Sequence, residues 1–179
     1  IYPGDPLQSR MWFLHAFSDG LPVYHSPIAH RLTGALEVEA LESAFQKVIE
    51  RHDSLRTTFF TEGNSFYQRV HPHIDFRLER VSIDNTDPLG IWEEADQRLR
   101  EVACRPLDLT SGPLIHASLI EVEPEDHLLI FVRHHILYDG WSNMNFLHEL
   151  SAHYNSLCSG TEPDLPEMPI QLADYSTWL

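Results

Sequence analysis

The chain has 179 residues, of which 42% are hydrophobic, and its 12 Lys and Arg against 27 Asp and Glu give a formal net charge of -15. This length and apolar content suffice for one hydrophobic core, so we expect a single domain or one lobe of a larger domain. A strongly negative chain repels phosphate backbones, which excludes nucleic acid as a partner. No apolar run approaches the roughly 18 residues that cross a membrane, and no signal-peptide pattern opens the chain, so we expect a soluble protein without a membrane partner.

The two cysteines, Cys104 and Cys158, stand at the ends of expected helices and have no partner at the short spacing of a zinc site or a disulfide framework. This usage is typical of a reducing compartment, and we expect a cytoplasmic protein. Because the sequence begins with Ile1 and not with methionine, we interpret it as a segment of a longer polypeptide.

Hydrophobic periodicity predicts alternating helices and strands without internal repeats, which is the pattern of an α/β protein. The first helix has an apolar face formed by Leu7, Met11, Leu14 and Phe17, and the second has one formed by Leu41, Phe45, Val48 and Ile49. In chain order we expect a helix over 7–17, a strand over 23–36, a helix over 38–52, a hairpin over 55–71, a strand over 76–83 continuing that hairpin as a meander, a helix over 89–104, paired strands over 114–122 and 127–135, a helix over 141–157 and the start of a further helix within 169–179.

Two adjacent histidines, His134 and His135, end the apolar run HLLIFVR and open the segment HHILYDG. Side chains alternate along a strand, so both rings cannot address one site unless the backbone turns between them. We therefore expect one histidine to carry chemistry and the other to be structural. A metal site is not predicted, because HHxxxD lacks the i, i+4 histidine pair of helical zinc sites. The pair His71 and His73, interrupted by Pro72, is a weak signal.

The segment HHILYDG resembles the HHxxxDG motif of condensation domains of nonribosomal peptide synthetases. LQSRMWFL is similar to the N-terminal motif of that family, and RHDSLRTTF to its arginine-bearing second motif. Further segments, RPLDLTSGPLIHASLI and QLADYSTWL among them, are also similar, so the resemblance spans the chain. It implies that residues 1–179 form the N-terminal lobe of such a domain, without its second lobe. The implied fold is a chloramphenicol acetyltransferase-like α/β sandwich, with a mixed, mainly antiparallel sheet and helices packed on it.

The resemblance implies peptide-bond formation in a tunnel between two lobes. The α-amine of an aminoacyl thioester on a downstream carrier protein attacks the acyl or peptidyl thioester on an upstream carrier protein. Both substrates are attached to phosphopantetheine arms, so no cofactor is bound directly. The resemblance also implies that the C-terminal lobe is a required partner. We expect the isolated lobe to be inactive. Two alternatives stay open: a stand-alone acyltransferase of the same superfamily that uses coenzyme A, and a non-catalytic lobe that binds a carrier protein.

The resemblance assigns the catalytic position to His135, and whether that ring acts as a base or as a hydrogen-bonding orienter stays open. An α-ammonium with a pKa near 7.7–8.0 loses its proton readily, so a strong base is not obligatory. His134 is expected to pack in the interior. Asp139 could orient His135 as in a catalytic triad, but the family implies that it pairs with Arg56 and holds the loop in shape. Gly140 allows a close backbone approach, a positive φ or a simple turn.

Three further residues beside the motif have weaker signals. We expect Trp141 to be a core or tunnel-wall residue and not a substrate contact, and Ser142 to cap the following helix. Arg133 departs from the apolar or small residue usual in the family, and its guanidinium is expected to reach solvent or an acid. Heterocyclization domains carry aspartate where His135 stands, and epimerization domains read DxVSW in place of DGWS, so condensation is preferred.

Overall fold

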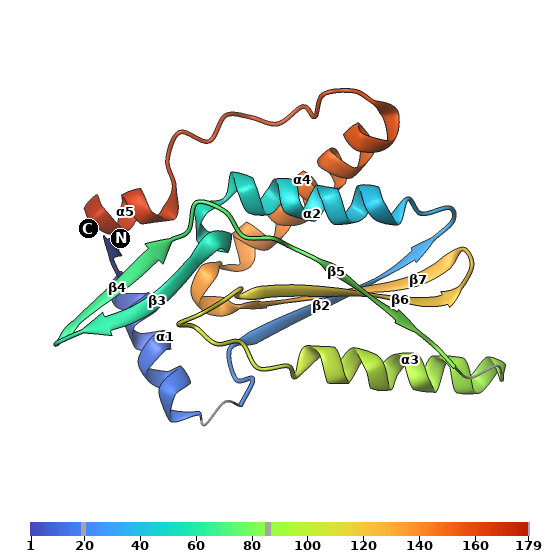
Figure 1. Ribbon diagram of the computed structural model, residues 1–179, viewed down its shortest axis with the longest axis horizontal. Helices are drawn as coiled ribbons and strands as arrows, with labels where there is room; N and C mark the ends of the chain where they lie inside the picture. Colours follow the sequence, from blue (N-terminus) through green and yellow to red (C-terminus); the bar gives the residue numbers. More distant parts are fainter. Residues whose placement is uncertain (19–20, 85–86, 179) are drawn as a thin grey trace.

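The computed structural model describes residues 1–18, 21–84 and 87–178. They form an α/β fold with one four-stranded and one three-stranded sheet (Figure 1). The larger sheet has the order β2 (His25–Thr33), β7 (Asp126–His134), β6 (Ile115–Glu123) and β5 (Leu78–Ser82), and the smaller has the order β1 (Tyr2–Pro3), β4 (Ser65–Val70) and β3 (Thr57–Glu62). The helices are α1 (Pro6–Phe17), α2 (Val38–Arg51), α3 (Pro88–Ala103), α4 (Gly140–Ser159) and α5 (Leu172–Trp178), with 3-10 turns η1 (Asp53–Arg56) and η2 (His135–Leu137).

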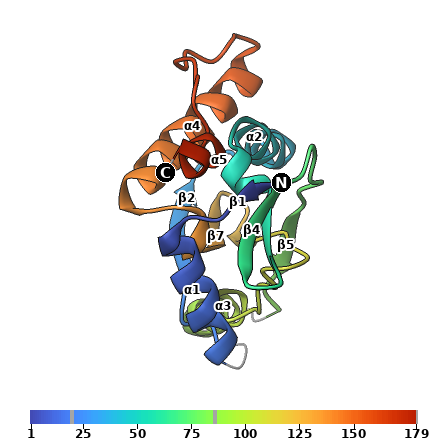
Figure 2. The same cartoon turned by 90° about the vertical axis from the view of Figure 1, so that its left-hand side faces the viewer.

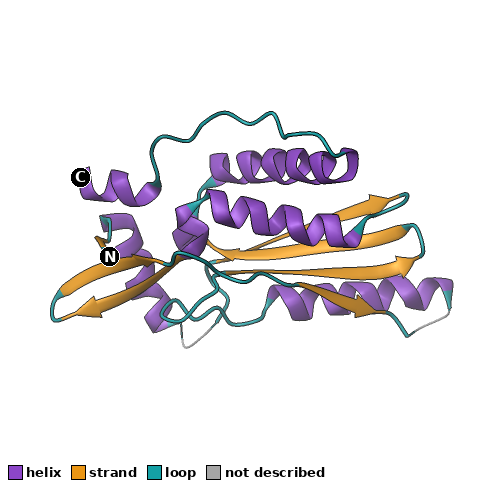
Figure 3. Cartoon of the chain, turned by 45° about the horizontal axis from the view of Figure 1, so that its top comes forward, coloured by secondary structure: helices purple, strands orange, loops and turns teal. Residues whose placement is uncertain are grey.

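Helices cover both faces of the larger sheet, with α2 and α4 on one side and α3 on the other (Figures 1 and 3). The face under α2 and α4 is filled by aromatic rings: Phe131 of β7 lies with its ring centroid 5.9 Å from that of Phe45 and 5.1 Å from that of Phe146. The apolar face predicted for α2 is confirmed, because all four of its residues are buried. These layers hold β7 in the centre of the core.

The end of β7 is where the chain leaves this core. Strand alternation turns Phe131 and Arg133 toward α2 and α4, while His134 points to the opposite face, toward α1. The next residue, His135, begins the 3-10 turn η2, and α4 follows at Gly140. The backbone therefore turns directly after His134 and separates the two adjacent histidines.

Helix α1 is present as predicted, but it buries a different face. Leu7 and Phe17 are mainly exposed, whereas Gln8 is buried and Met11 and Trp12 pack against the core. The helix is apolar around much of its circumference, so its apolar residues alone do not specify which side packs. The buried amide of Gln8 completes a capping box with Asp5 at the start of the helix.

The meander predicted after the hairpin is wrong. β3 and β4 do form the expected antiparallel hairpin, but β5 leaves that sheet and pairs in parallel with β6 in the larger one. The crossover between β5 and β6 contains α3, which is how two parallel strands are usually connected. The antiparallel pair β6 and β7 and the long helix α4 are confirmed near their predicted bounds. Among the described residues, no helix is long and apolar enough to span a membrane.

Candidate active site

His135 is held in one orientation at the end of β7. Its main-chain N–H donates to the Tyr24 carbonyl at 2.8 Å, and its Nδ1 lies 2.8 Å from the Tyr138 carbonyl oxygen. Because a carbonyl oxygen only accepts, Nδ1 must carry a proton and donate it. The ring also stacks on Tyr138, with centroids 5.4 Å apart. In the neutral ring Nε2 is therefore left with a free lone pair, as a general base or a hydrogen-bond acceptor requires.

A cleft of about 430 Å³ adjoins His135. Two of the elements that contribute to it, α1 and α5, face the viewer in Figure 2. The walls of the cleft come from α1, residues 52–54, the motif segment 135–139 and residues 168–172, so segments far apart in the sequence meet here. A larger hollow of about 630 Å³ lies between β2 and α4. That hollow contains no residue of HHILYDG, and we regard the smaller cleft as the candidate site.

His134 lies in the interior, as strand alternation predicts, and it is fully buried. Its Nδ1 accepts from the Ile136 N–H at 3.2 Å, which ties the ring to the turn that carries His135. The ring centroid lies 5.1 Å from that of His15 and 6.0 Å from that of His25. Burial, with smaller contributions from these histidines, lowers the pKa of His134 to about 3. The ring is therefore neutral and serves as a hydrogen-bond acceptor.

The buried ring of His134 predicts a loss of stability in mild acid. In the unfolded chain His134 takes up a proton near pH 6.5, but in the folded chain only near pH 3. The free energy of unfolding should therefore fall by about 2 kcal/mol for this ring as the pH drops from 7.5 to 5. Burial also lowers the pKa of His15 and of His25, so both add to the loss.

Urea unfolding of this chain at a series of pH values measures the effect. His134→Asn keeps an acceptor for the Ile136 N–H but removes the titrating ring, so its stability should depend less on pH over this range. His148→Asn, on the exposed face of α4, is the matched control and should keep the wild-type dependence. An unchanged dependence in His134→Asn would show that this ring does not contribute.

The predicted pair between Asp139 and Arg56 is wrong. Asp139 is the N-cap of α4, where its Oδ1 accepts from the Ser142 N–H at 2.9 Å and from the Ser142 hydroxyl at 2.8 Å. These hydrogen bonds lower the pKa of Asp139. The carboxylate thus satisfies the free N–H groups at the start of a helix and does not meet the arginine.

Arg56 instead binds the main chain around its own turn. Its guanidinium donates to four carbonyl oxygens and to Asp53 Oδ1 at 2.6 Å; the carbonyls are those of Ile49, Glu50, His71 and Pro72. These acceptors belong to the end of α2, to η1 and to the segment after β4. Arg56 therefore joins the larger part of the core to the hairpin.

The structure excludes some of the alternatives expected for the residues around Asp139. The N-cap of α4 is Asp139 and not Ser142, and the Ser142 hydroxyl donates to the Asp139 carboxylate. Of the two places expected for Trp141, the core is excluded because 83% of its surface is exposed, and a position on the tunnel wall stays a prediction. Gly140 begins α4 without a positive φ, and a Cβ built there meets no described atom within 4 Å. Nothing in the described chain thus requires glycine at this position.

Arg133 reaches neither solvent nor an acid, contrary to expectation. Its side chain is 1% exposed, and its Nη2 donates to Asn143 Oδ1 at 2.6 Å. The guanidinium carbon lies 4.0 Å from the ring centroid of Tyr138 and 4.5 Å from that of Phe146. Aromatic faces replace part of the lost hydration of a cation, which is how a guanidinium tolerates this site. Burial still lowers the pKa of Arg133 to about 10.

His71 and His73 do not share a site. His71 Nε2 lies 2.8 Å from Thr58 Oγ1, and His73 Nε2 lies 2.9 Å from Asp75 Oδ1. Across residues 1–18, 21–84 and 87–178, no group of three or more His, Cys, Asp or Glu side chains is arranged to hold a metal ion.

The fold is shared with solved structures of the chloramphenicol acetyltransferase-like α/β class. The chain is similar to the X-domain in its complex with OxyB from teicoplanin biosynthesis, with a TM-score of 0.87 and 31% identity, covering 99% of this chain and 37% of that one. It is also similar to a variant of the starter condensation domain of rhizomide synthetase RzmA in complex with C8-CoA, with a TM-score of 0.82 and 25% identity, covering 92% of this chain and 37% of that one.

The Condensation domain family model matches residues 1–179. A linear gramicidin synthase subunit from Brevibacillus parabrevis is 39% identical over 171 residues, which are 96% of this chain and 2% of that protein. This chain belongs to the family of condensation domains of nonribosomal peptide synthetases, as the motifs indicated. It spans only a small part of the synthetase and less than half of the two solved chains.

Two groups that hold His135 have no signature in the sequence. The carbonyls of Tyr24 and Tyr138 receive its main-chain and ring N–H groups, and any residue can supply a main-chain acceptor. Tyr138 stands at a variable position of HHxxxDG. The only sequence signal for the ring stacking is its aromatic side chain, which stands three residues after His135 in a short turn.

Proposed function

We propose that this chain is the N-terminal lobe of a condensation domain that joins two carrier-bound substrates by an amide bond. His135 is its catalytic residue. The observation that carries the proposal is the ring orientation: Nδ1 is engaged by the Tyr138 carbonyl, which leaves Nε2 to address a substrate in the adjoining cleft. This arrangement supports a base or an acceptor at the reacting nitrogen.

The proposed reaction is an aminolysis of a thioester. The amine nitrogen of the acceptor attacks the thioester carbon of the donor, the new C–N bond forms, and a tetrahedral intermediate results. His135 Nε2 accepts the proton that the nitrogen loses. When the C–S bond breaks, the thiol of the phosphopantetheine arm leaves with a proton returned from the imidazolium. An imidazole can make both transfers in turn, because its free nitrogen accepts a proton and the resulting imidazolium donates one, and no metal or redox group is needed.

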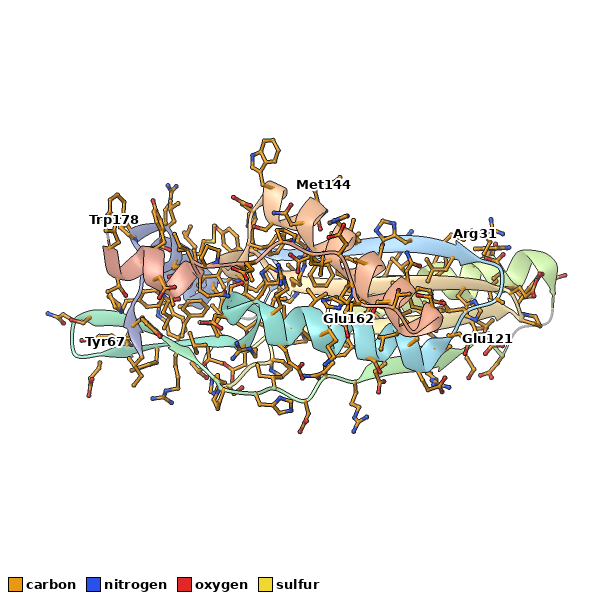
Figure 4. The ribbon with its side chains drawn as sticks, turned by 90° about the horizontal axis from the view of Figure 1, so that it is seen from above. Arg31, Tyr67, Glu121, Met144, Glu162 and Trp178 are labelled. Atoms are coloured by element: carbon orange, nitrogen blue, oxygen red, sulfur yellow. The ribbon has the colours of Figure 1, made fainter. Side chains whose placement is uncertain are left out.

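Exposed apolar side chains on α1, α4, α5 and the segment before α5 support the proposal that a second lobe packs on this surface. Six large apolar side chains on α1, α4, α5 and the segment before α5 are each at least 65% exposed: Leu7, Phe17, Trp141, Met144, Ile170 and Trp178. Figure 4 shows Met144 and Trp178 projecting on the same side of the molecule. Soluble proteins rarely leave such groups of apolar side chains uncovered. A lobe packed here would close the cleft beside His135 into a tunnel.

The phosphopantetheine arms are inferred from the family. One solved structure of the RzmA starter domain is a complex with C8-CoA, and coenzyme A contains the same arm. We propose that donor and acceptor reach this chain on arms of this chemical form, each carried by its own carrier protein. The exposed, unpaired cysteines Cys104 and Cys158 are compatible with a reducing cytoplasm.

The test is a condensation assay with the complete two-lobed domain and two loaded carrier proteins. The expected product is a dipeptidyl thioester on the downstream carrier, detected by mass spectrometry. The 179-residue chain alone should form no product, because half a tunnel cannot orient two arms. Turnover with acyl-coenzyme A and a free amine, but not with loaded carriers, would instead support a stand-alone acyltransferase. Carrier binding without turnover by the complete domain would support a non-catalytic lobe.

A further inference from the structure

Arg133, Tyr138 and His135 form a continuous contact from the core to the candidate site. The exposed ring of His135 stacks on Tyr138, and the buried guanidinium of Arg133 lies 4.0 Å from the centroid of the same Tyr138 ring. The Tyr138 hydroxyl is buried and has no hydrogen-bond partner among the described residues. The faces of this ring, and not its hydroxyl, therefore fix its position.

Resting on the function proposed for His135, we infer that Arg133 is a positioning residue. By stacking on Tyr138 and donating to Asn143 at the start of α4, it holds the turn whose carbonyl binds the His135 Nδ1–H. Arg133 acts through Tyr138 and is separated from the substrate by it. A small cavity of about 80 Å³, lined by Arg133, Tyr138 and Phe146 among others, leaves the turn room to shift when the guanidinium is lost.

The cost of burying this cation supports a functional reason for it. Within the described part of the chain Arg133 forms no ion pair, and its Nε has no hydrogen-bond partner there. Burial lowers the pKa of the group, so the charged form is less stable in the fold than in water. An apolar residue of similar length would fill the same space without that cost. A purely structural residue at this position would not need to be an arginine.

Substitutions in the complete domain, assayed with two loaded carrier proteins, test the inference. Arg133→Met keeps the length and removes the planar cation. It should lower kcat by about 10- to 100-fold, because the base is misplaced, and leave KM for both carriers nearly unchanged. Its thermal midpoint should equal or exceed that of the wild type. Selective ¹⁵N-histidine labelling should show His135 with Nδ1 protonated in the wild type and as a mixture of tautomers in Arg133→Met.

Controls separate this role from folding and from the proposed function. Arg69→Met removes another arginine stacked on an aromatic ring, 4.8 Å from the Phe60 centroid, and should change neither kcat nor the tautomer. Arg133→Lys keeps a charge without the planar group, so it should lower kcat and the fraction of the Nδ1-protonated tautomer of His135 by less than Arg133→Met does. It replaces Arg133→Met in the experiment if that variant does not fold. A wild-type kcat or a wild-type tautomer in the folded Arg133 variant would overturn the inference. If His135→Ala retains full activity, the proposed function fails, while the tautomer measurement still tests Arg133.

Discussion

In the complete domain, His135→Ala should lower the rate of amide formation by about 10²- to 10⁴-fold if the ring transfers a proton, and by less if it only orients the amine. The stability of the fold should change by about 1 kcal/mol or less, because the ring is exposed and its side chain makes one hydrogen bond, to the Tyr138 carbonyl. Single-turnover rates with preloaded carriers, together with urea unfolding, measure both effects. A collapse of the fold with little change in the rate of the folded fraction would contradict the assignment.

The variant His135→Asn separates the role of Nε2 from that of Nδ1. The asparagine side-chain amide can still donate to the Tyr138 carbonyl in place of Nδ1, but no group replaces Nε2. If Nε2 accepts the proton, His135→Asn should be as slow as His135→Ala. If the ring acts mainly by holding the turn, His135→Asn should recover most of the wild-type rate.

Local sequence patterns predict where helices and strands lie better than they predict which other elements those helices and strands pack against or pair with. The face of α2 could be read from the sequence because its four apolar residues stand at helical spacing among charged ones. In α1, apolar residues lie on several sides, so the buried face depends on β4 and η2, which the local pattern does not contain. The same holds for β5: its residues indicate a strand, but its parallel pairing with β6 is a long-range contact.

The motif led to the position of the site but not to its hydrogen bonds. Strand alternation separates His134 from His135, and the structure has the first ring buried and the second exposed. The partner expected for Asp139 was wrong because two donors of Ser142, at the start of the same helix, are available locally. The surroundings of Arg133 could not be predicted from the sequence, because the rings of Phe146 and Tyr138 that contact its guanidinium are brought together only by the packing of α4 and η2.

Arg56→Ala should destabilise this chain by about 3–5 kcal/mol, the largest loss of stability expected among the residues of the motifs. The variant leaves four main-chain carbonyls and the Asp53 carboxylate without their donor, in a place where the arginine is only 9% exposed. Buried acceptors without a partner lose hydration and gain nothing in return. Urea unfolding of the chain measures the change. Arg69→Ala removes an exposed arginine from β4 and, as the control, should cost about 1 kcal/mol or less.

The double variant Arg56→Ala/Asp139→Ala tests whether the charges of Arg56 and Asp139 interact. Asp139→Ala removes the N-cap of α4 and should cost about 1 kcal/mol by itself. Because Arg56 donates to the main chain and to Asp53, while Asp139 accepts from Ser142, the two losses should add to within about 0.5 kcal/mol. A double variant clearly more stable than this sum would mean that the charges pair in solution, since removing both would leave neither unpaired. Additive losses would instead make each side chain a support for its own segment, with Arg56 joining α2 to the hairpin and Asp139 starting the helix that follows His135.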